Sequence, residues 1–105
     1  MEKKTENVIF SYTDAEALAD GVLVSVDASP VNRVTRAVFD HLAPQLEFRG
    51  RGPLFDLSSL RGAISAVLAL KPDEGGWRRG SYEGKELWLV PNEVEGLTLM
   101  FPEDY

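Results

Sequence analysis

The chain has 105 residues, 44% of them hydrophobic and 27% charged, which is typical of one soluble domain with a buried core. It contains no cysteine and a single histidine, so disulfides, thiolate chemistry, zinc sites with sulfur ligands and two-imidazole sites within one chain are excluded. The net charge of −6 argues against general nucleic-acid binding, which requires clustered cations to neutralise phosphates.

The sequence carries no sign of a membrane or export segment. No apolar run approaches the roughly 18 residues that a membrane-spanning helix needs. Residues 1–7 are polar and no hydrophobic stretch follows them, unlike a signal peptide. We therefore expect a cytoplasmic protein, with residues 1–7 as a flexible polar arm and residues 8–105 as a single α+β domain.

The first quarter of the chain predicts a strand, a short helix and a second strand. Residues 8–12 are mostly β-branched and aromatic, which favours a strand. Thr13 followed by Glu16 forms a capping box that predicts a helix start, and Gly21 predicts its end. The apolar run at residues 22–26 then predicts a buried strand.

Residues 27–44 predict a turn that leads into an amphipathic helix. Pro30 suits the first position of that helix, and Pro44 ends it. Side chains that recur at spacings of three and four define its inner face: Val31, Val34, Ala37, Val38, His41 and Leu42. Residues 45–52 after it predict a loop.

The longest predicted helix follows Pro53. Its apolar stripe consists of Leu57, Leu60, Ile64, Val67 and Leu68. Gly62 within it costs about 1 kcal/mol relative to alanine, which indicates close approach of another backbone. Ser58 and Ser59 at its start are interpreted as caps rather than nucleophiles, because no G-x-S-x-G elbow surrounds them.

The last third of the chain predicts a hairpin. Residues 71–80 are rich in glycine and predict a loop that leads into it. Residues 86–90 and 97–101 predict two antiparallel strands joined by residues 91–96. Together these elements predict an α+β fold, with a small antiparallel sheet packed against two or three helices.

No catalytic residue, metal ligand or cofactor site is predicted. His41 would need a positioned partner, and its neighbour Asp40 does not face it on a helix, so a structural or exposed histidine is expected. The C-terminal carboxylates lack the D-x-D-x-D-G spacing of a calcium loop and are interpreted mainly as a solvated face.

The glycine-rich loop holds the most distinctive candidate site. Tryptophan and arginine are enriched at binding hot spots. A site there would bind a carboxylate, a phosphate or an aromatic partner surface; alternatively, Trp77 packs on the core while the arginines pair with C-terminal carboxylates. With the nearby acidic residues, the predicted partner-binding set is Trp77, Arg78, Arg79, Tyr82, Glu83, Glu86, Glu93 and Glu95.

Arg49 and Arg51 form an alternative, weaker candidate site for an anion. They precede the start of the long helix, where backbone amides favour negative charge. The segment lacks the G-x-x-x-x-G-K-[ST] pattern of a phosphate loop. They belong to the second hypothesis, a small ligand- or nucleic-acid-binding module.

Residues 11–24, read as S-Y-T-D-A-E-A-L-A-D-G-V-L-V, resemble the opening of a family of uncharacterised small proteins carried on bacterial phages and plasmids. Weaker similarity follows at residues 30–39, 52–56 and 97–104, and the chain departs from the family between residues 26 and 30, where members usually carry a longer connection. This domain-of-unknown-function family has no established activity. The resemblance therefore implies a setting on mobile genetic elements and no catalytic residues.

The leading hypothesis is a non-enzymatic, protein-binding accessory factor of a phage or mobile element. Its specific version is an anti-CRISPR-like inhibitor of a host defence system, whose acidic surface occupies a basic channel on a host or effector protein, such as a nucleic-acid-binding complex. The alternative is a small ligand- or nucleic-acid-binding module that uses the arginines and Trp77, although the net charge disfavours direct nucleic-acid binding. A third reading, a small hydrolase, would require converging carboxylates.

Overall fold

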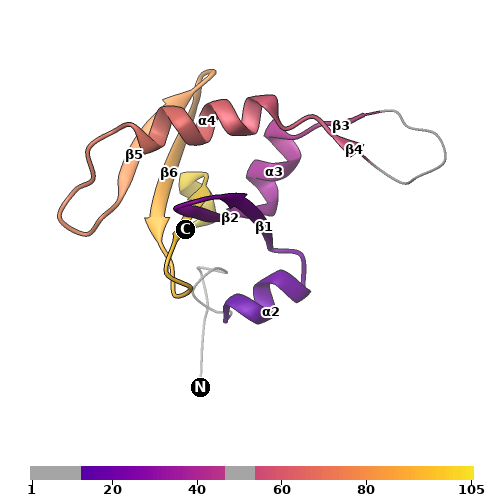
Figure 1. The fold of residues 1–105 in the computed structure, drawn as a ribbon, viewed down its shortest axis with the longest axis horizontal. Coiled ribbons are helices and arrows are strands. Elements are labelled where there is room, and N and C mark those ends of the chain that lie inside the picture. The colour runs from indigo at the N-terminus through magenta and orange to yellow at the C-terminus, as the bar shows by residue number, and fades with distance from the viewer. Residues whose placement is uncertain (1–12, 47–53) are drawn as a thin grey trace.

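The computed structural model describes residues 13–46 and 54–105 (Figure 1). In chain order its elements are α2 (Asp14–Ala19), β1 (Leu23–Ala28), β2 (Val31–Thr35), α3 (Arg36–Leu42), β3 (Gln45–Leu46), β4 (Leu54–Phe55), α4 (Ser58–Leu68), β5 (Arg78–Tyr82), β6 (Lys85–Pro91), β7 (Leu97–Met100) and the 3-10 helix η1 (Pro102–Asp104). These elements confirm the α+β class. None of the helices in the described ranges has the length and apolar character to cross a membrane.

Five strands form one mixed sheet in the order β1-β2-β7-β6-β5. The β1–β2, β5–β6 and β6–β7 pairs are antiparallel, and the last of these confirms the predicted C-terminal hairpin. β2 and β7 run parallel, with Val34 opposite Leu99. This parallel pairing joins the two antiparallel parts of the sheet. The sheet is therefore mixed, and the prediction of a purely antiparallel sheet is wrong.

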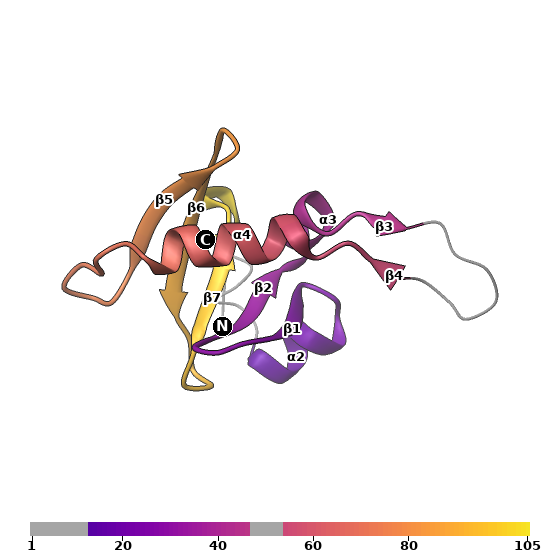
Figure 2. The same cartoon turned by 45° about the horizontal axis from the view of Figure 1, so that its top comes forward.

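Helices α3 and α4 cover one face of the sheet, which we call the core face; α4 crosses the strands in Figure 2. Each fully buried aliphatic side chain there contributes about 1.5–3 kcal/mol to folding. The core combines Val38, Phe39 and Leu42 of α3, Leu60, Ala63, Ile64 and Val67 of α4, and Val31, Val34, Leu87, Leu89, Leu97 and Leu99 of the sheet.

Helix α2 packs on the opposite side, which we call the outer face, where it buries Ala17. The predicted capping box is confirmed: Thr13 Oγ1 accepts from the Glu16 amide at 3.1 Å, and Glu16 Oε1 accepts from the Thr13 amide at 3.1 Å. Gly21 follows the helix with a φ of +78°, which suits glycine at this stop.

The helix predicted from residue 31 is wrong for its first five residues, which form β2; α3 begins only at Arg36. The turn predicted at residues 27–30 is confined to Ser29 and Pro30, which join β1 to β2 through a cis peptide bond. The pairing of β2 with β7 shifts register between Val31 and Arg33. Such an irregularity lets Val31 and Val34, three residues apart, both face the core, and this spacing resembles a helix.

Strand β5 was predicted as part of a loop up to Gly80, because its sequence lacks alternating apolar residues. It pairs with β6 through a two-residue turn at Glu83 and Gly84, with φ values of 51° and 82°. Both values suit a type I′ hairpin turn, in which glycine is common. The Glu83-Gly84 turn sequence was therefore the signal in the sequence from which β5 could have been predicted.

Residues 45–52 were predicted as a loop, but Gln45–Leu46 pairs with Leu54–Phe55 to form the small second sheet. Residues 8–12, which were predicted as a strand, lie outside the described ranges, as do residues 47–53. At the start of α4, neither serine caps the helix: Asp56 accepts from the Ser58 amide at 3.0 Å and from its hydroxyl at 2.7 Å. Gly62 does mark a close approach, although the neighbour is the Tyr82 side chain and not a backbone.

Candidate functional site

Three aromatic rings from different parts of the chain meet on the outer face. Trp77 precedes β5, Trp88 lies on β6 and Tyr105 follows η1. The ring centroids lie 5.6 Å apart for Trp77 and Trp88, 4.7 Å for Trp77 and Tyr105, and 6.2 Å for Trp88 and Tyr105. All three side chains are partly exposed, so they form a surface rather than a core.

Arg79 completes this group. It lies directly opposite Trp88 in the β5–β6 ladder. Its guanidinium carbon lies 4.9 Å from the Trp77 ring centroid and 5.4 Å from that of Trp88, within cation–π distance of both. Its side chain is 49% exposed. We call Trp77, Arg79, Trp88 and Tyr105 the aromatic patch.

Asp73 holds the aromatic patch in place from the preceding loop. Its Oδ1 accepts from the Gly75 and Trp77 amides, both at 2.9 Å, and its Oδ2 accepts from Arg79 at 2.7 Å. The pKa of Asp73 is lowered from its ordinary value, chiefly by the Trp77 amide and then by Arg79 and the Gly75 amide. One carboxylate therefore fixes both the loop and the arginine over the rings.

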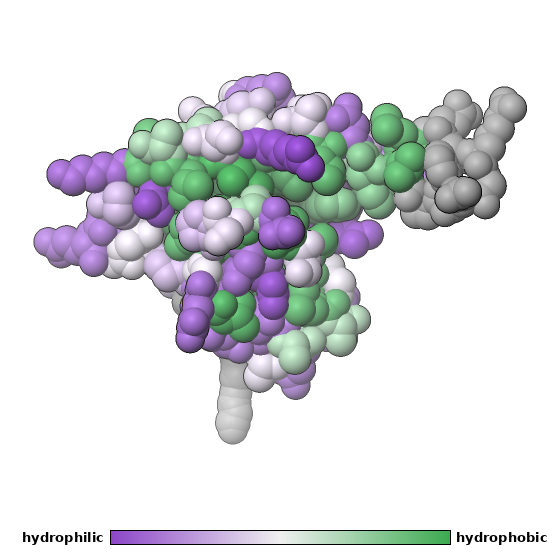
Figure 3. Space-filling model, viewed as in Figure 1, coloured by the Kyte–Doolittle hydropathy of each residue, from purple (hydrophilic) through white to green (hydrophobic). Residues whose placement is uncertain are grey.

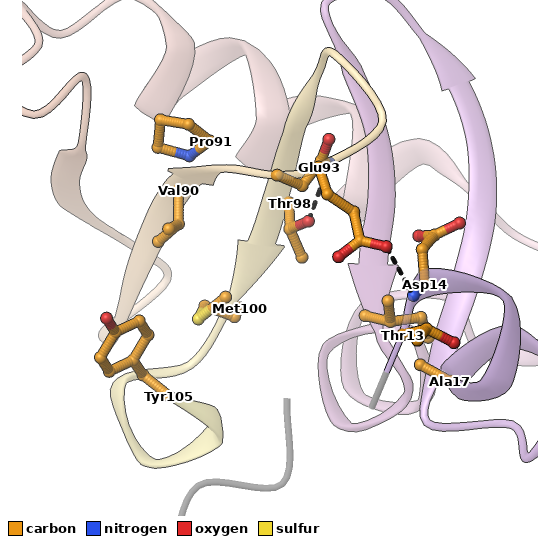
Figure 4. Close-up of a pocket in the computed structure, with 11 residues that line it drawn as sticks. Thr13, Asp14, Ala17, Val90, Pro91, Glu93, Thr98, Met100 and Tyr105 are labelled. Atoms are coloured by element: carbon orange, nitrogen blue, oxygen red, sulfur yellow. Dashed lines mark hydrogen bonds between the residues drawn. The ribbon is translucent and has the colours of Figure 1, made fainter. Parts of the chain in front are cut away.

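A pocket of about 240 Å³ adjoins the aromatic patch on the outer face (Figure 4). Val90, Met100 and Thr98 line it from β6 and β7, and Asp14 and Ala17 line it from α2. Figure 4 shows Tyr105 on one side of Met100 and the α2 residues on the other. Tyr105 belongs to both the pocket and the aromatic patch, so the two features form one continuous surface.

Glu93 brings an acidic group to this outer-face pocket. Its Oε2 accepts from the Asp14 amide at 3.0 Å, which ties the β6–β7 loop to the start of α2. Asp14 itself forms a bidentate pair with Arg33, at 2.8 and 2.9 Å. Thr98, only 4% exposed, accepts from the Asn92 side chain at 3.0 Å. The pocket thus has polar groups at one end and apolar walls elsewhere.

The structure separates the predicted arginine and tyrosine candidates. Trp77 and Arg79 lie together on the outer face. Arg78 and Tyr82 alternate with Arg79 along β5 and point toward α4: the Arg78 guanidinium donates to the Leu70 carbonyl at 2.9 Å, and Tyr82 packs on Gly62. Arg49 and Arg51 lie outside the described residues.

The predicted acidic candidates do not form one group. Glu83 and Glu86 lie at one end of β6, and Glu86 accepts from the Trp88 indole at 2.9 Å. Glu93 and Glu95 lie in the loop at the other end of β6, a strand of seven residues that spans roughly 20 Å. Only Glu86 and Glu93 therefore contact the aromatic patch or the outer-face pocket.

Sequence reasoning missed Asp73 and Tyr105. The spacing of Asp73 before two glycines and Trp77 is an Asx-turn signal, in which a carboxylate bonds to amides that follow it. Nothing local marks Tyr105, because its ring contacts come from tertiary packing. His41 is exposed, and its ring lies 5.8 Å from that of Phe101. Within the described residues, no three His, Asp or Glu side chains are grouped to hold a metal.

A second hollow lies on the core side of the sheet. This core-side groove, of about 490 Å³, lies between β1 and α4 and includes Phe55 and Leu57 in its lining. Leu54, which also lines the groove, is 49% exposed. Figure 3 shows apolar side chains along α4 that continue toward β4. Its walls are mostly apolar, and Ser25, Asp27 and Arg61 are the polar residues in its lining.

In comparisons with known proteins, no family model, no curated protein and no solved structure matches the chain.

Proposed function

We propose that the protein is a non-catalytic binding module whose protein partner docks on the outer face, over the aromatic patch and the adjoining pocket. The observation that carries this proposal is the exposed Arg79 guanidinium held between the rings of Trp77 and Trp88. Trp, Tyr and Arg are the side chains most enriched where protein interfaces gain their binding energy. Here they converge from three parts of the chain.

The aromatic patch is also fixed before any partner arrives. Asp73 bonds to the Trp77 amide and to the Arg79 side chain, and Glu86 bonds to the Trp88 indole. Ordering a mobile side chain at an interface costs about 0.5–1.5 kcal/mol. These contacts remove part of that cost from the binding step, which supports a recognition role.

The charge of the chain favours a basic partner. The net charge is −6, and both Glu86 and Glu93 border the docking surface. Long-range attraction of this kind accelerates encounter with a cationic surface. With the resemblance to phage- and plasmid-borne proteins, the proposal extends to an anti-CRISPR-like accessory factor that acts in the bacterial cytoplasm and occupies a basic nucleic-acid channel on a host defence protein.

The alternative, nucleic-acid binding by Arg78 and Arg79 of β5, receives less support from the geometry. Arg79 is paired with Asp73, and Arg78 is turned toward the Leu70 carbonyl on the other side of the sheet. Neither guanidinium is presented alone to a phosphate. A salt-dependent affinity for single-stranded DNA or RNA that is lost in Arg79→Ala would favour this alternative.

Affinity capture from a bacterial host lysate, followed by a defence-interference assay, tests the proposal. Arg79→Ala and Trp88→Ala should each weaken capture of the partner about 30-fold or more, as expected for hot-spot residues. Arg36→Ala is the matched control, because it removes an exposed guanidinium from α3 on the core side of the sheet. Capture that is equal in all variants with unchanged thermal melting would contradict the proposal, as would the absence of any partner.

A further inference from the structure

The outer-face pocket has the size of one side chain rather than of a free metabolite. Its volume is about 240 Å³, below the range of roughly 300–1,000 Å³ that is usual for small-molecule sites. Its apolar walls include Met100, which is 1% exposed, and Val90, which is 6% exposed. An unbranched hydrocarbon chain fits such walls.

One end of the pocket carries negative charge that no cation of the described residues neutralises. The Asp14 carboxylate lies in the pocket lining but is paired with Arg33. Glu93 accepts one backbone hydrogen bond and has no ion pair there. The net effect is one carboxylate at the rim of an apolar hollow.

The other side of the pocket is aromatic. The Tyr105 ring borders it and is packed against Trp77 and Trp88. An aromatic ring at this side packs against the aliphatic stem of a long side chain, whose charged end reaches the carboxylate at the other end. A carboxylate, an aromatic ring and apolar walls around one hollow together match a long side chain with a positive end.

We propose that the outer-face pocket receives a lysine or arginine side chain of the protein partner. The aliphatic stem lies against Val90 and Met100, with the Tyr105 ring beside it, and the cationic end lies near Glu93. This inference rests on the proposed function, because it assigns the chemistry of the residue that the partner inserts beside the aromatic patch. The contact between this cationic end and Glu93 would be one reason why the partner is basic.

Small probes test this without knowledge of the partner. The chain has two methionines, so methyl-labelled methionine gives two NMR signals, and Met100→Leu assigns the one inside the pocket. The protein is titrated at low ionic strength with n-butylammonium, n-butylguanidinium and, as a neutral probe of equal length, 1-butanol. The cations should shift the Met100 signal with about threefold to tenfold higher affinity than 1-butanol, and added salt should shrink that preference.

Glu93→Gln should abolish the preference for the cations, whereas Glu95→Gln, which removes an exposed carboxylate from the same loop, should leave it unchanged. Equal affinities for cations and alcohol, or equal effects of the two substitutions, would overturn the inference. The proposed function can fail separately: the pocket can prefer cations while no partner is captured. Conversely, if capture depends on Trp88 but the pocket shows no preference for cations, the inference is overturned and the proposed function stands.

Discussion

The guanidinium of Arg33 and the carboxylate of Asp14 form two parallel hydrogen bonds, of 2.8 and 2.9 Å, between β2 and α2. Both side chains are largely buried, with 14% and 12% of their surface exposed. The hydrogen bond to Asp14 raises the pKa of Arg33 above its ordinary value, so this guanidinium stays charged. This pair positions the helix that forms one wall of the outer-face pocket.

Removal of either partner should therefore destabilise the protein. We expect Asp14→Asn and Arg33→Met each to lower the free energy of unfolding by about 2 kcal/mol, because each leaves a largely buried group without its bidentate partner. The double variant should lose clearly less than the sum of the two, as measured by urea denaturation. Additive losses would show that the pair does not act as a unit.

Thr35 connects the start of α3 to the C-terminal turn. Its buried hydroxyl accepts from the Val38 amide at 3.3 Å and donates to Asp104 at 2.7 Å. Thr35→Val keeps the shape but removes both bonds, and should cost about 2 kcal/mol in chemical denaturation. Thr35→Ser keeps both hydrogen bonds and loses one methyl group, which should lower the free energy of unfolding by about 1 kcal/mol. Equal losses in the two variants would contradict the assigned role of the hydroxyl.

Gly62 on α4 lies against the Tyr82 hydroxyl of β5, in contact with the place where a Cβ atom would lie. Alanine would gain about 1 kcal/mol in helix propensity but would overpack this contact at a cost of about 1–3 kcal/mol. We expect Gly62→Ala to destabilise the wild-type protein by about 1 kcal/mol. The same substitution in the Tyr82→Phe background should be markedly less harmful in thermal melts, and stabilisation by Gly62→Ala alone would refute this account.

Acid should loosen the aromatic patch through Asp73. Its folded-state pKa is lowered, first by the Trp77 amide, so its contribution to stability is present above the unfolded pKa of about 3.9 and is lost as pH falls through the folded value. Tryptophan fluorescence should therefore change below about pH 4 in the wild-type protein. In Asp73→Asn this step should be missing.

Asp56 supplies a matched control for that titration. Its pKa is lowered by the Ser58 amide and hydroxyl, and it lies just before α4, away from both tryptophans. Asp56→Asn should keep the acid-induced fluorescence step. Loss of the step in Asp56→Asn, or its persistence in Asp73→Asn, would assign the change to general acid unfolding instead.

Elements with a strong local pattern could be predicted from the sequence. The capping box of Thr13 and Glu16 located α2, and the apolar repeat from Leu60 to Val67 located α4. β2 could not be predicted, because its register shift gives Val31 and Val34 a helical spacing and its true partner is distant β7. Tertiary pairing overrode the local pattern there.

The same distinction applies to the functional site. Trp77 and Arg79 were found by residue type, but Arg78 and Tyr82 could be separated from them only once β5 was known to be a strand with alternating sides. Tyr105 joins the aromatic patch through packing that no sequence spacing records. The residue types suggested where the site lies, whereas the alternation of side chains along β5 and the tertiary packing determine which residues belong to it.

The central place of β7 has a consequence for biosynthesis. It is the last strand of the five-stranded sheet along the chain, yet it lies between β2 and β6 and pairs with both. In a nascent polypeptide that has not yet released residues 97–100 from the ribosome, the strands of this sheet can pair only as the separate hairpins β1–β2 and β5–β6, and a single two-stranded hairpin is marginally stable in water. Leu60 and Ile64 of α4 then lack part of their apolar cover. Chaperone contact during translation should therefore persist until β7 emerges, after which the sheet closes in one cooperative step.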